Sequence, residues 1–143
     1  LLALDVGAKT IGLALSDPGR MIATPWRTLA RRKFSQDAPE LILCFEEAGA
    51  VAWVVGLPIS MDGSHSDQTR RARQFALELR RRHPAPLLLW DERLSTAAVQ
   101  RFMIEQADMT RKRRAELVDK LAAGYFLQSC LEHLRTVQPE QES

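Results

Sequence analysis

Asp5 interrupts an otherwise apolar run, residues 1–6 (LLALDV), of the kind that forms a strand buried on both faces. Burying a carboxylate costs several kcal/mol, so a cation, a hydrogen-bond cage or a metal ion must compensate its charge. Gly7 and Gly12 nearby carry no side chains and would let a ligand approach the backbone. Asp5 is therefore the first candidate catalytic and metal-binding residue.

Asp91 and Glu92 directly follow a second short apolar run, residues 87–90 (LLLW). In open α/β sheets, ligands bind in the crevice where the strands end. Adjacent residues of a strand face opposite ways, so only one of the two acids can share a face with Asp5, and the sequence leaves open which one. We expect the other to pair with an arginine, such as the adjacent Arg93, or to cap the following helix.

Asp119 lies on the predicted last helix, away from that helix's polar stripe. At about 100° per residue, it shares a face with Ala122, Ala123 and Phe126. This small, apolar face is suited to packing closely on a sheet. Asp119 is thus a third acid carried into an apolar environment.

Three carboxylates brought close together repel one another and raise each other's pKa, unless a divalent cation keeps them ionised. Oxygen ligands select Mg²⁺ or Mn²⁺ over zinc, and no cysteine or histidine sits at ligand spacing beside these acids. Two such ions about 4 Å apart activate a water and stabilise the leaving oxygen of a phosphodiester. The acids therefore predict a hydrolase that depends on Mg²⁺ or Mn²⁺.

Basic residues are clustered, although the net charge is only +2. Three groups stand out, at 31–33, at 70–82 and at 111–114, and such segregation can create a locally positive face that binds a phosphate backbone. The residues predicted to contact nucleic acid are Lys9, Arg70, Arg71, Arg73, Arg93, Arg111, Lys112, Arg113 and Arg114.

Apolar patterns and turn residues predict an α/β fold with a mixed five-stranded sheet, three antiparallel strands first and then two parallel ones, covered by helices on both faces. One domain is expected over residues 1–137, with a disordered polar tail at 138–143. The expected strands are 1–7, 10–16, 21–29, 50–56 and 87–90. The expected helices run from about Asp37 to Gly49, from a Ser64/Asp67 capping box to about Arg82, from Ser95 to about 106, and over 111–135.

Composition indicates a soluble protein, with 45% hydrophobic and 27% charged residues. No apolar run approaches the roughly 20 residues that cross a bilayer, and no signal peptide is evident, so no membrane partner is expected. Cys44 and Cys130 each lie in a helix-like apolar stretch and are predicted to be buried free thiols. A reducing, cytoplasmic location is the corresponding expectation.

Four ordered sequence blocks resemble the YqgF (RuvX) family, and together they cover nearly the whole chain. The blocks are 4–17 (LDVGAKTIGLALSD), 55–58 (VGLP) with 61–64 (MDGS), 91–96 (DERLST), and Asp119 with Ala122 and Ala123. The resemblance implies an RNase H-like fold, shared with the RuvC resolvases. It also implies a metal-dependent nuclease site formed by Asp5, one acid of the Asp91–Glu92 pair, and Asp119.

The family is described as a nuclease of pre-16S rRNA and, earlier, as a Holliday-junction resolvase. An endonuclease that processes the 5′ end of this ribosomal RNA precursor is the leading hypothesis, with four-way DNA as the alternative substrate. A monomer and a homodimer both remain open. A non-catalytic nucleic-acid-binding module is an alternative of another class. So is an ATP-binding phosphotransferase half-domain, because Asp5-x-Gly7 before a hairpin also resembles the phosphate-binding turn of the actin and sugar-kinase superfamily.

Overall fold

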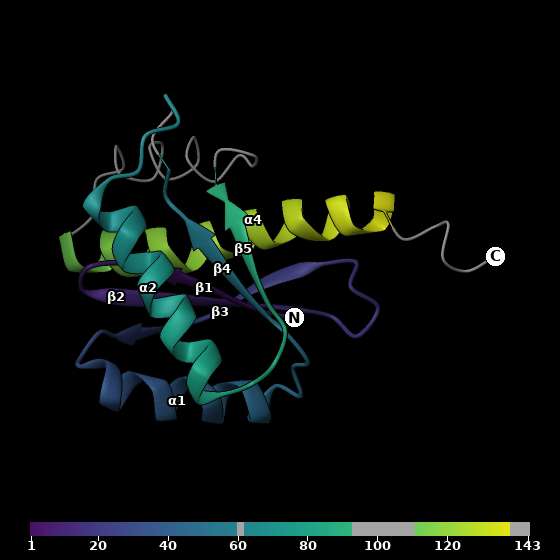
Figure 1. The fold of residues 1–143 in the computed structure, drawn as a ribbon. Coiled ribbons are helices and arrows are strands. Elements are labelled where there is room, and N and C mark those ends of the chain that lie inside the picture. Colours follow the sequence, from purple (N-terminus) through teal and green to yellow (C-terminus); the bar gives the residue numbers. More distant parts are fainter. Residues whose placement is uncertain (60–61, 93–110, 138–143) are drawn as a thin grey trace.

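The computed structural model describes residues 1–59, 62–92 and 111–137, and the side chains of the last helix from Leu121 onward (Figure 1). The elements in chain order are β1 (Leu2–Val6), β2 (Thr10–Ser16), β3 (Ala23–Ala30), α1 (Phe34–Glu47), β4 (Trp53–Leu57), α2 (Asp67–Arg82), β5 (Leu87–Asp91) and α4 (Arg111–Val137).

The strands form one mixed sheet in the order β3-β2-β1-β4-β5. β1, β2 and β3 are antiparallel neighbours, whereas β4 is parallel to both β1 and β5. α1 and α2 cover one face and α4 crosses the other (Figure 1). The predicted α/β architecture, with three antiparallel strands followed by two parallel ones, is confirmed.

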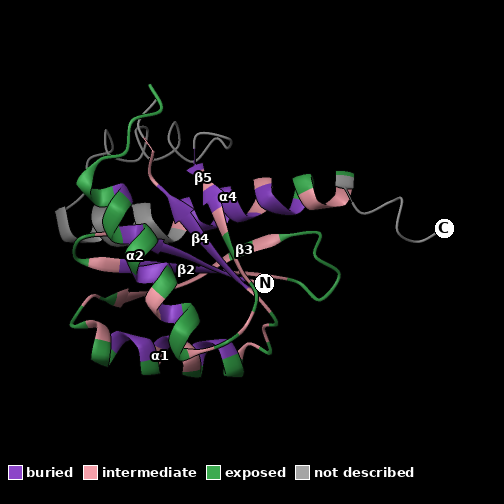
Figure 2. Cartoon of the chain, in the orientation of Figure 1, coloured by how far each residue is buried: buried purple, intermediate pink, exposed green. Residues whose placement is uncertain are grey.

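Alternation along β1 divides its residues between two cores. Leu2, Leu4 and Val6 pack with residues of α1 and α2, whereas Ala3 packs with residues of α4. Every residue of β1 is buried, as Figure 2 shows for the centre of the sheet. Because Asp5 alternates with Leu4 and Val6, it belongs to the face covered by α4.

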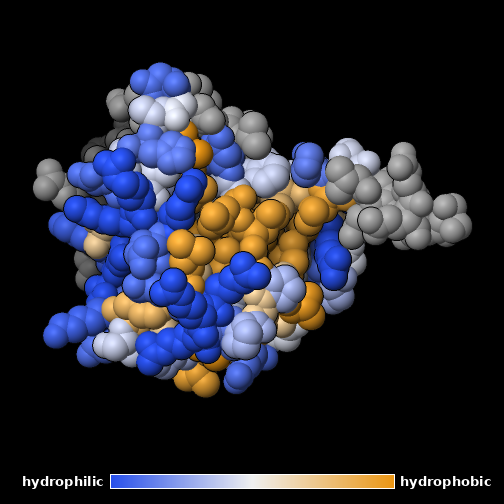
Figure 3. Space-filling model, viewed as in Figure 1, coloured by the Kyte–Doolittle hydropathy of each residue, from blue (hydrophilic) through white to orange (hydrophobic). Residues whose placement is uncertain are grey.

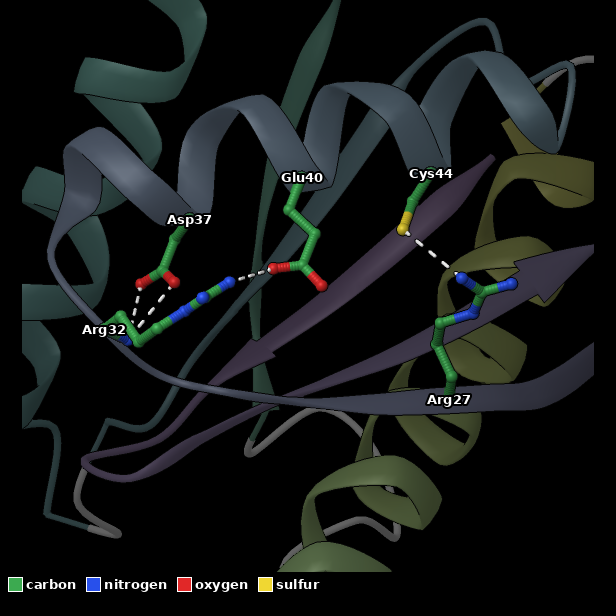
Figure 4. A network of polar contacts seen from close by, with 5 residues as sticks. All are labelled: Arg27, Arg32, Asp37, Glu40 and Cys44. Atoms are coloured by element: carbon green, nitrogen blue, oxygen red, sulfur yellow. Dashed lines mark hydrogen bonds and ion pairs between the residues drawn. The ribbon is translucent and has the colours of Figure 1, made fainter.

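The predicted start of α1 at Asp37 is wrong, because the helix begins three residues earlier, at Phe34. Asp37 does act on the helix terminus, but from inside the helix. Its buried carboxylate accepts hydrogen bonds from the backbone N–H of Arg32 at 3.1 Å to each oxygen (Figure 4). A carboxylate can therefore bind an amide that precedes the helix without being its first residue. The helix ends before Gly49, whose positive φ of 65° suits glycine, as predicted.

The predicted Ser64/Asp67 capping box is also wrong, since Ser66 is the N-cap of α2. The Ser66 hydroxyl accepts a hydrogen bond from the backbone N–H of Thr69 at 3.3 Å. The buried hydroxyl of Thr69 donates in turn to the carbonyl of Pro58, just after β4, at 2.8 Å. The helix therefore begins after Ser66 and not after Ser64, because the bond from Thr69 to Pro58 fixes the first turn of α2 to the end of β4. The predicted end at Arg82 is confirmed.

The remaining boundaries move by a few residues. The strands expected at 21–29 and 50–56 form as 23–30 and 53–57, and the last helix extends to Val137. The helix expected from Ser95 and the tail at 138–143 lie outside the described residues. Both cysteines are buried free thiols, as predicted. Within the described part of the chain, no helix is long and apolar enough to span a membrane.

Gly56 of β4 lies in close contact with a side chain of α4. A Cβ built there would lie 2.7 Å from the ring of Phe126, closer than van der Waals contact allows. We expect Gly56→Ala to lower the free energy of unfolding by about 1–3 kcal/mol, measured by urea denaturation. Phe126→Leu removes the opposing ring atoms, so Gly56→Ala should cost less in that background. Equal costs in both backgrounds would contradict this packing.

Cys130 of α4 is fully buried against the sheet, and this burial raises the pKa of its thiol from 9.0 to about 11. Because the unfolded chain loses this proton first, stability should fall as pH rises from about 9 towards 11. Urea titrations at pH 8 and pH 10 should show a smaller pH-dependent loss for Cys130→Ala than for the unsubstituted protein. An equal loss of stability in both proteins would show that the Cys130 thiol does not cause it.

Candidate functional site

Asp5 lies in a row of residues that runs across the α4 face of the sheet. On one side it pairs with Gly12 of β2. On the other, Leu4 pairs with Val55, so Gly56 of β4 lies beside Asp5. The acid is only 4% exposed, yet both lateral neighbours lack a side chain. A central strand thus carries a buried carboxylate whose neighbours in the sheet are both glycines.

Helix α4 covers this row of residues and keeps it buried. The ring of Phe126 packs over Gly56, and Ala122 and Ala123 are buried one turn earlier. The small side chains let the helix lie close to the sheet. At the other side of the helix, Gly124 fits against Pro25 of β3, where an added Cβ would lie 3.0 Å from the proline ring. The face predicted to be small and apolar is therefore the one that packs on the sheet.

The structure distinguishes Asp91 from Glu92 by face. Leu89 packs with the α1/α2 core and Trp90 with the α4 core. The same alternation places half-buried Asp91, the last residue of β5, on the α1/α2 side. Glu92 is the first residue after the strand, and continuing the alternation by one residue would put it on the α4 side. Glu92 is 5% exposed. β4 separates β1 from β5, so the backbones of Asp5 and Glu92 stand two strand spacings apart, about 10 Å laterally.

Asp119 belongs to α4, but its side chain lies outside the described residues. Among the side chains that are described, no three histidine, cysteine, aspartate or glutamate groups gather closely enough to hold a metal ion. The described carboxylates of the candidate site are thus Asp5 and Glu92.

Asp17, the last residue of the first sequence block, serves a turn rather than this site. Its carboxylate accepts hydrogen bonds from the backbone N–H groups of Met21 at 2.7 Å and Ile22 at 2.8 Å. The bonds from Ile22 and then Met21 lower the pKa of Asp17. It follows β2, at the end of the sheet opposite Asp5.

The predicted nucleic-acid-binding residues are only partly described. Lys9 is exposed in the β1–β2 turn, and Arg70, Arg71 and Arg73 are exposed on α2. Figure 3 shows that the surface over α2 is largely hydrophilic, with an apolar area beside it along β5. Outside the description fall Arg93 and the side chains of Arg111, Lys112, Arg113 and Arg114.

Arg70 and Arg71 differ in their surroundings despite being adjacent. Arg70 donates to the carboxylate of Asp67 at 2.8 Å and to the carbonyl of His65 at 3.1 Å. The hydrogen bond from Arg70 lowers the pKa of Asp67. Arg71 instead lines a pocket at the end of β1, and so does Arg31.

Arg31 was not among the residues that the sequence singled out for nucleic acid. Its Nη1 donates to the carbonyl of Gly7 at 2.7 Å, which brings it to the residue that follows β1. The sequence contains part of the signal, because a three-stranded antiparallel meander returns the end of β3 to the β1–β2 turn. The arginine's place in a basic run gave no reason to select it over Arg32, whose guanidinium pairs with Glu40 at 2.6 Å (Figure 4).

Comparison with known proteins identifies relatives over almost the full chain. A relative from Rhodospirillum rubrum is 50% identical over 141 residues, covering 99% of this chain and 88% of its own length. Another, from Paramagnetospirillum magneticum, is 52% identical over 133 residues, covering 93% of this chain and 85% of its own. Both carry the name "Putative pre-16S rRNA nuclease".

Two solved structures share the fold. RuvC of T. thermophilus in complex with a Holliday junction substrate superposes with a TM-score of 0.57, at 11% identity, covering 96% of this chain and 97% of that one. A second T. thermophilus RuvC structure gives a TM-score of 0.54, with 95% and 97% coverage. The RNase H-like architecture implied by the sequence resemblance is thus confirmed.

The family model described as "RuvX: Holliday junction resolvase" matches residues 1–133. This match, the relatives at about 50% identity and the RuvC-like structures each cover most of the chain. The chain therefore belongs to the RuvX (YqgF) family.

Proposed function

We propose that this protein is a divalent-metal-dependent endonuclease that hydrolyses phosphodiester bonds in structured nucleic acid. The precursor of 16S rRNA, processed at its 5′ end, is the proposed substrate, in keeping with the name of its relatives. The observation that carries the proposal is a pair of buried carboxylates, Asp5 and Glu92. Asp5 lies on the α4 face, and both acids lie at the same end of the sheet.

The donor set fits Mg²⁺ or Mn²⁺. The two carboxylates are 4% and 5% exposed and have lost most of their hydration. A hard divalent cation would compensate that loss. Asp5 and Glu92 would hold the metal, with Asp119 as the proposed third ligand from α4. When bound, the metal would supply the positive charge that activates a water and stabilises the leaving oxygen of the phosphodiester.

Strand pairing is what holds Asp5 in position. It sits between two hydrogen-bonded strands, so its backbone cannot shift without breaking both ladders. Gly12 and Gly56 place no side chains of their own beside the carboxylate, and the ring of Phe126 from α4 packs over Gly56. This arrangement orients the carboxylate without a flexible loop.

Glu92 is our proposed ligand from the β5 end, in preference to Asp91. The alternation that puts Trp90 on the α4 side would, continued past the strand, put Glu92 there too, and Glu92 is the more buried of the two. Asp91 is then the acid that we expect to pair with an arginine or to cap the following helix.

Exposed basic residues supply the proposed contacts to the phosphate backbone. Lys9 in the β1–β2 turn and Arg71 and Arg73 on α2 are our candidates among the described residues, and Arg93 with the four basic residues at 111–114 completes the set. Such contacts fix the substrate's register and make affinity depend on salt.

Four-way DNA is the second candidate substrate, favoured by the description of the matching family model. Cleavage assays with structured RNA and four-way DNA, each with Mg²⁺ and with Mn²⁺, separate the two. A resolvase would cut the junction symmetrically through paired active sites, whereas trimming of RNA needs one site. Binding of both substrates without cleavage of either would favour a non-catalytic module.

Asp5→Asn keeps the size of the side chain and removes its charge. We expect cleavage to fall about 1,000-fold, because several kcal/mol of charge stabilisation is lost at about 1.4 kcal/mol per tenfold. Glu92→Gln should cause a comparable loss and Asp91→Asn a much smaller one, with circular dichroism to check folding. Cleavage that survives Asp5→Asn would exclude the mechanism. An Asp91→Asn loss exceeding that of Glu92→Gln would reverse the choice of ligand.

Divalent ions should stabilise the folded protein if the buried acids bind them. Mg²⁺ or Mn²⁺ at 100 times its Kd should raise the free energy of unfolding by about 2.7 kcal/mol. Differential scanning fluorimetry with and without EDTA should show this rise in Tm for the unsubstituted chain and not for Asp5→Asn. Equal shifts in both proteins would place the ion elsewhere.

A further inference from the structure

A pocket of about 330 Å³ opens at the end of β1, on the side covered by α2. It begins one residue beyond Asp5. Its lining is formed by the end of β1 with the following turn, by a residue just after β3, and by the beginning of α2: Val6, Gly7, Ala8, Arg31, Gln68 and Arg71. The lining thus contains two guanidinium groups and one amide, and no carboxylate.

Arg31 is held in place by the fold. Its backbone N–H donates to the carbonyl of Lys9 at 2.8 Å, and its Nη1 donates to Gly7. Its guanidinium also lies 5.4 Å from the ring centroid of Phe75, a buried residue of α2. These contacts fix the side chain between the β1–β2 turn and α2, so binding an anion there would cost little side-chain entropy.

Arg71 enters the same pocket from a rigid element. The bond from Thr69 to Pro58 holds this end of α2 against the end of β4. Among the described residues, no carboxylate lies within ion-pair distance of Arg31 or Arg71, whereas adjacent Arg70 is paired with Asp67. The fold therefore places two positive charges around one pocket, and neither forms an ion pair with a described acid. After the hydrogen bond from Arg70, the charge of Arg71 does contribute to lowering the pKa of Asp67.

We propose that this pocket binds a phosphate group of the polynucleotide, adjacent in the bound strand to the phosphodiester that meets Asp5. Arg31 and Arg71 would each donate N–H bonds to the phosphate oxygens, and the Gln68 amide would supply a further donor. The choice of a polynucleotide rests on the proposed function. The chemistry itself, a phosphate between two guanidinium groups, could also be satisfied by a small phosphate compound.

Adjacency follows from the strand that connects the two places. Asp5 faces α4, and Val6, next along β1, faces α2. A nucleic-acid strand that crosses the end of β1 would therefore meet the acid on one side of the sheet and the two arginines on the other. Such a second contact would fix the register of the substrate at the acid site.

Arg71→Gln tests the pocket, with Arg81→Gln as the matched control. Both residues are exposed arginines of α2, but Arg81 lies at its far end and does not line the pocket. Binding of a fluorescent single-stranded RNA 12-mer is measured by anisotropy in EDTA across 50–200 mM salt. We expect Arg71→Gln to weaken binding and to reduce the slope of log K against log salt by about 0.7, the value for one phosphate contact. Arg81→Gln should leave the slope unchanged. Equal effects of the two variants would overturn the proposal.

Two further arms identify the source of the phosphate. A single neutral methylphosphonate is moved along the RNA, and one position should weaken binding to the unsubstituted protein but not to Arg71→Gln. Inorganic phosphate serves as the small competitor. If it stabilises the protein through Arg71 while no methylphosphonate position depends on Arg71, the pocket binds small phosphates and the polynucleotide assignment is wrong.

Cleavage is assayed separately, so that this proposal and the nuclease function can fail independently. If RNA binding depends on Arg71 but no metal-dependent cleavage occurs, the phosphate pocket is supported and the nuclease function is excluded. If the unsubstituted protein cleaves RNA, and Arg71→Gln has the same RNA affinity and salt slope as the unsubstituted protein, the nuclease function is supported and the phosphate pocket is excluded.

Discussion

The burial of one carboxylate in the central strand is the constraint on which the candidate site depends. Asp5 does not stabilise the core, since a leucine at this position would extend the apolar run and remove the electrostatic cost of burying a charge. The neighbours accommodate it: Gly12 and Gly56 flank it without side chains, and α4 presents small residues to this face. The sheet is therefore built around the acid at some expense in packing. Such local conflicts with good core design are typical of functional positions.

The two faces of the sheet divide the work. The α1/α2 face holds the larger aliphatic core, with Leu2, Leu4 and Ile11, and provides most of the hydrophobic stabilisation near β1. The α4 face carries the small residues and buried Asp5. Exposed ion pairs such as Arg32–Glu40 and Arg70–Asp67 add little to stability. The end of β1 lies where the faces meet, so its two sides can contact one nucleic-acid strand.

Several features could be predicted from the sequence because they depend on local pattern. The strand at Thr10–Ser16, the end of α2 at Arg82 and the apolar face of the last helix follow from alternation, charge and helical spacing. Helix starts were less predictable. Asp37 and Ser66 show why: a capping oxygen can come from several nearby positions, and contacts such as Thr69 with Pro58 decide between them.

By itself, the sequence determined which acids conflict with their surroundings, since Asp5 in an apolar strand needs no neighbour from elsewhere in the chain to be conspicuous. It could not choose between Asp91 and Glu92, nor connect Arg31 with Gly7 and Arg71. Those relations depend on which strands pair, in which register, and which helix covers each face. Only the tertiary structure decides them, because strand pairing brings together residues that are far apart in the chain. The number of residues between them does not indicate how close they lie in space.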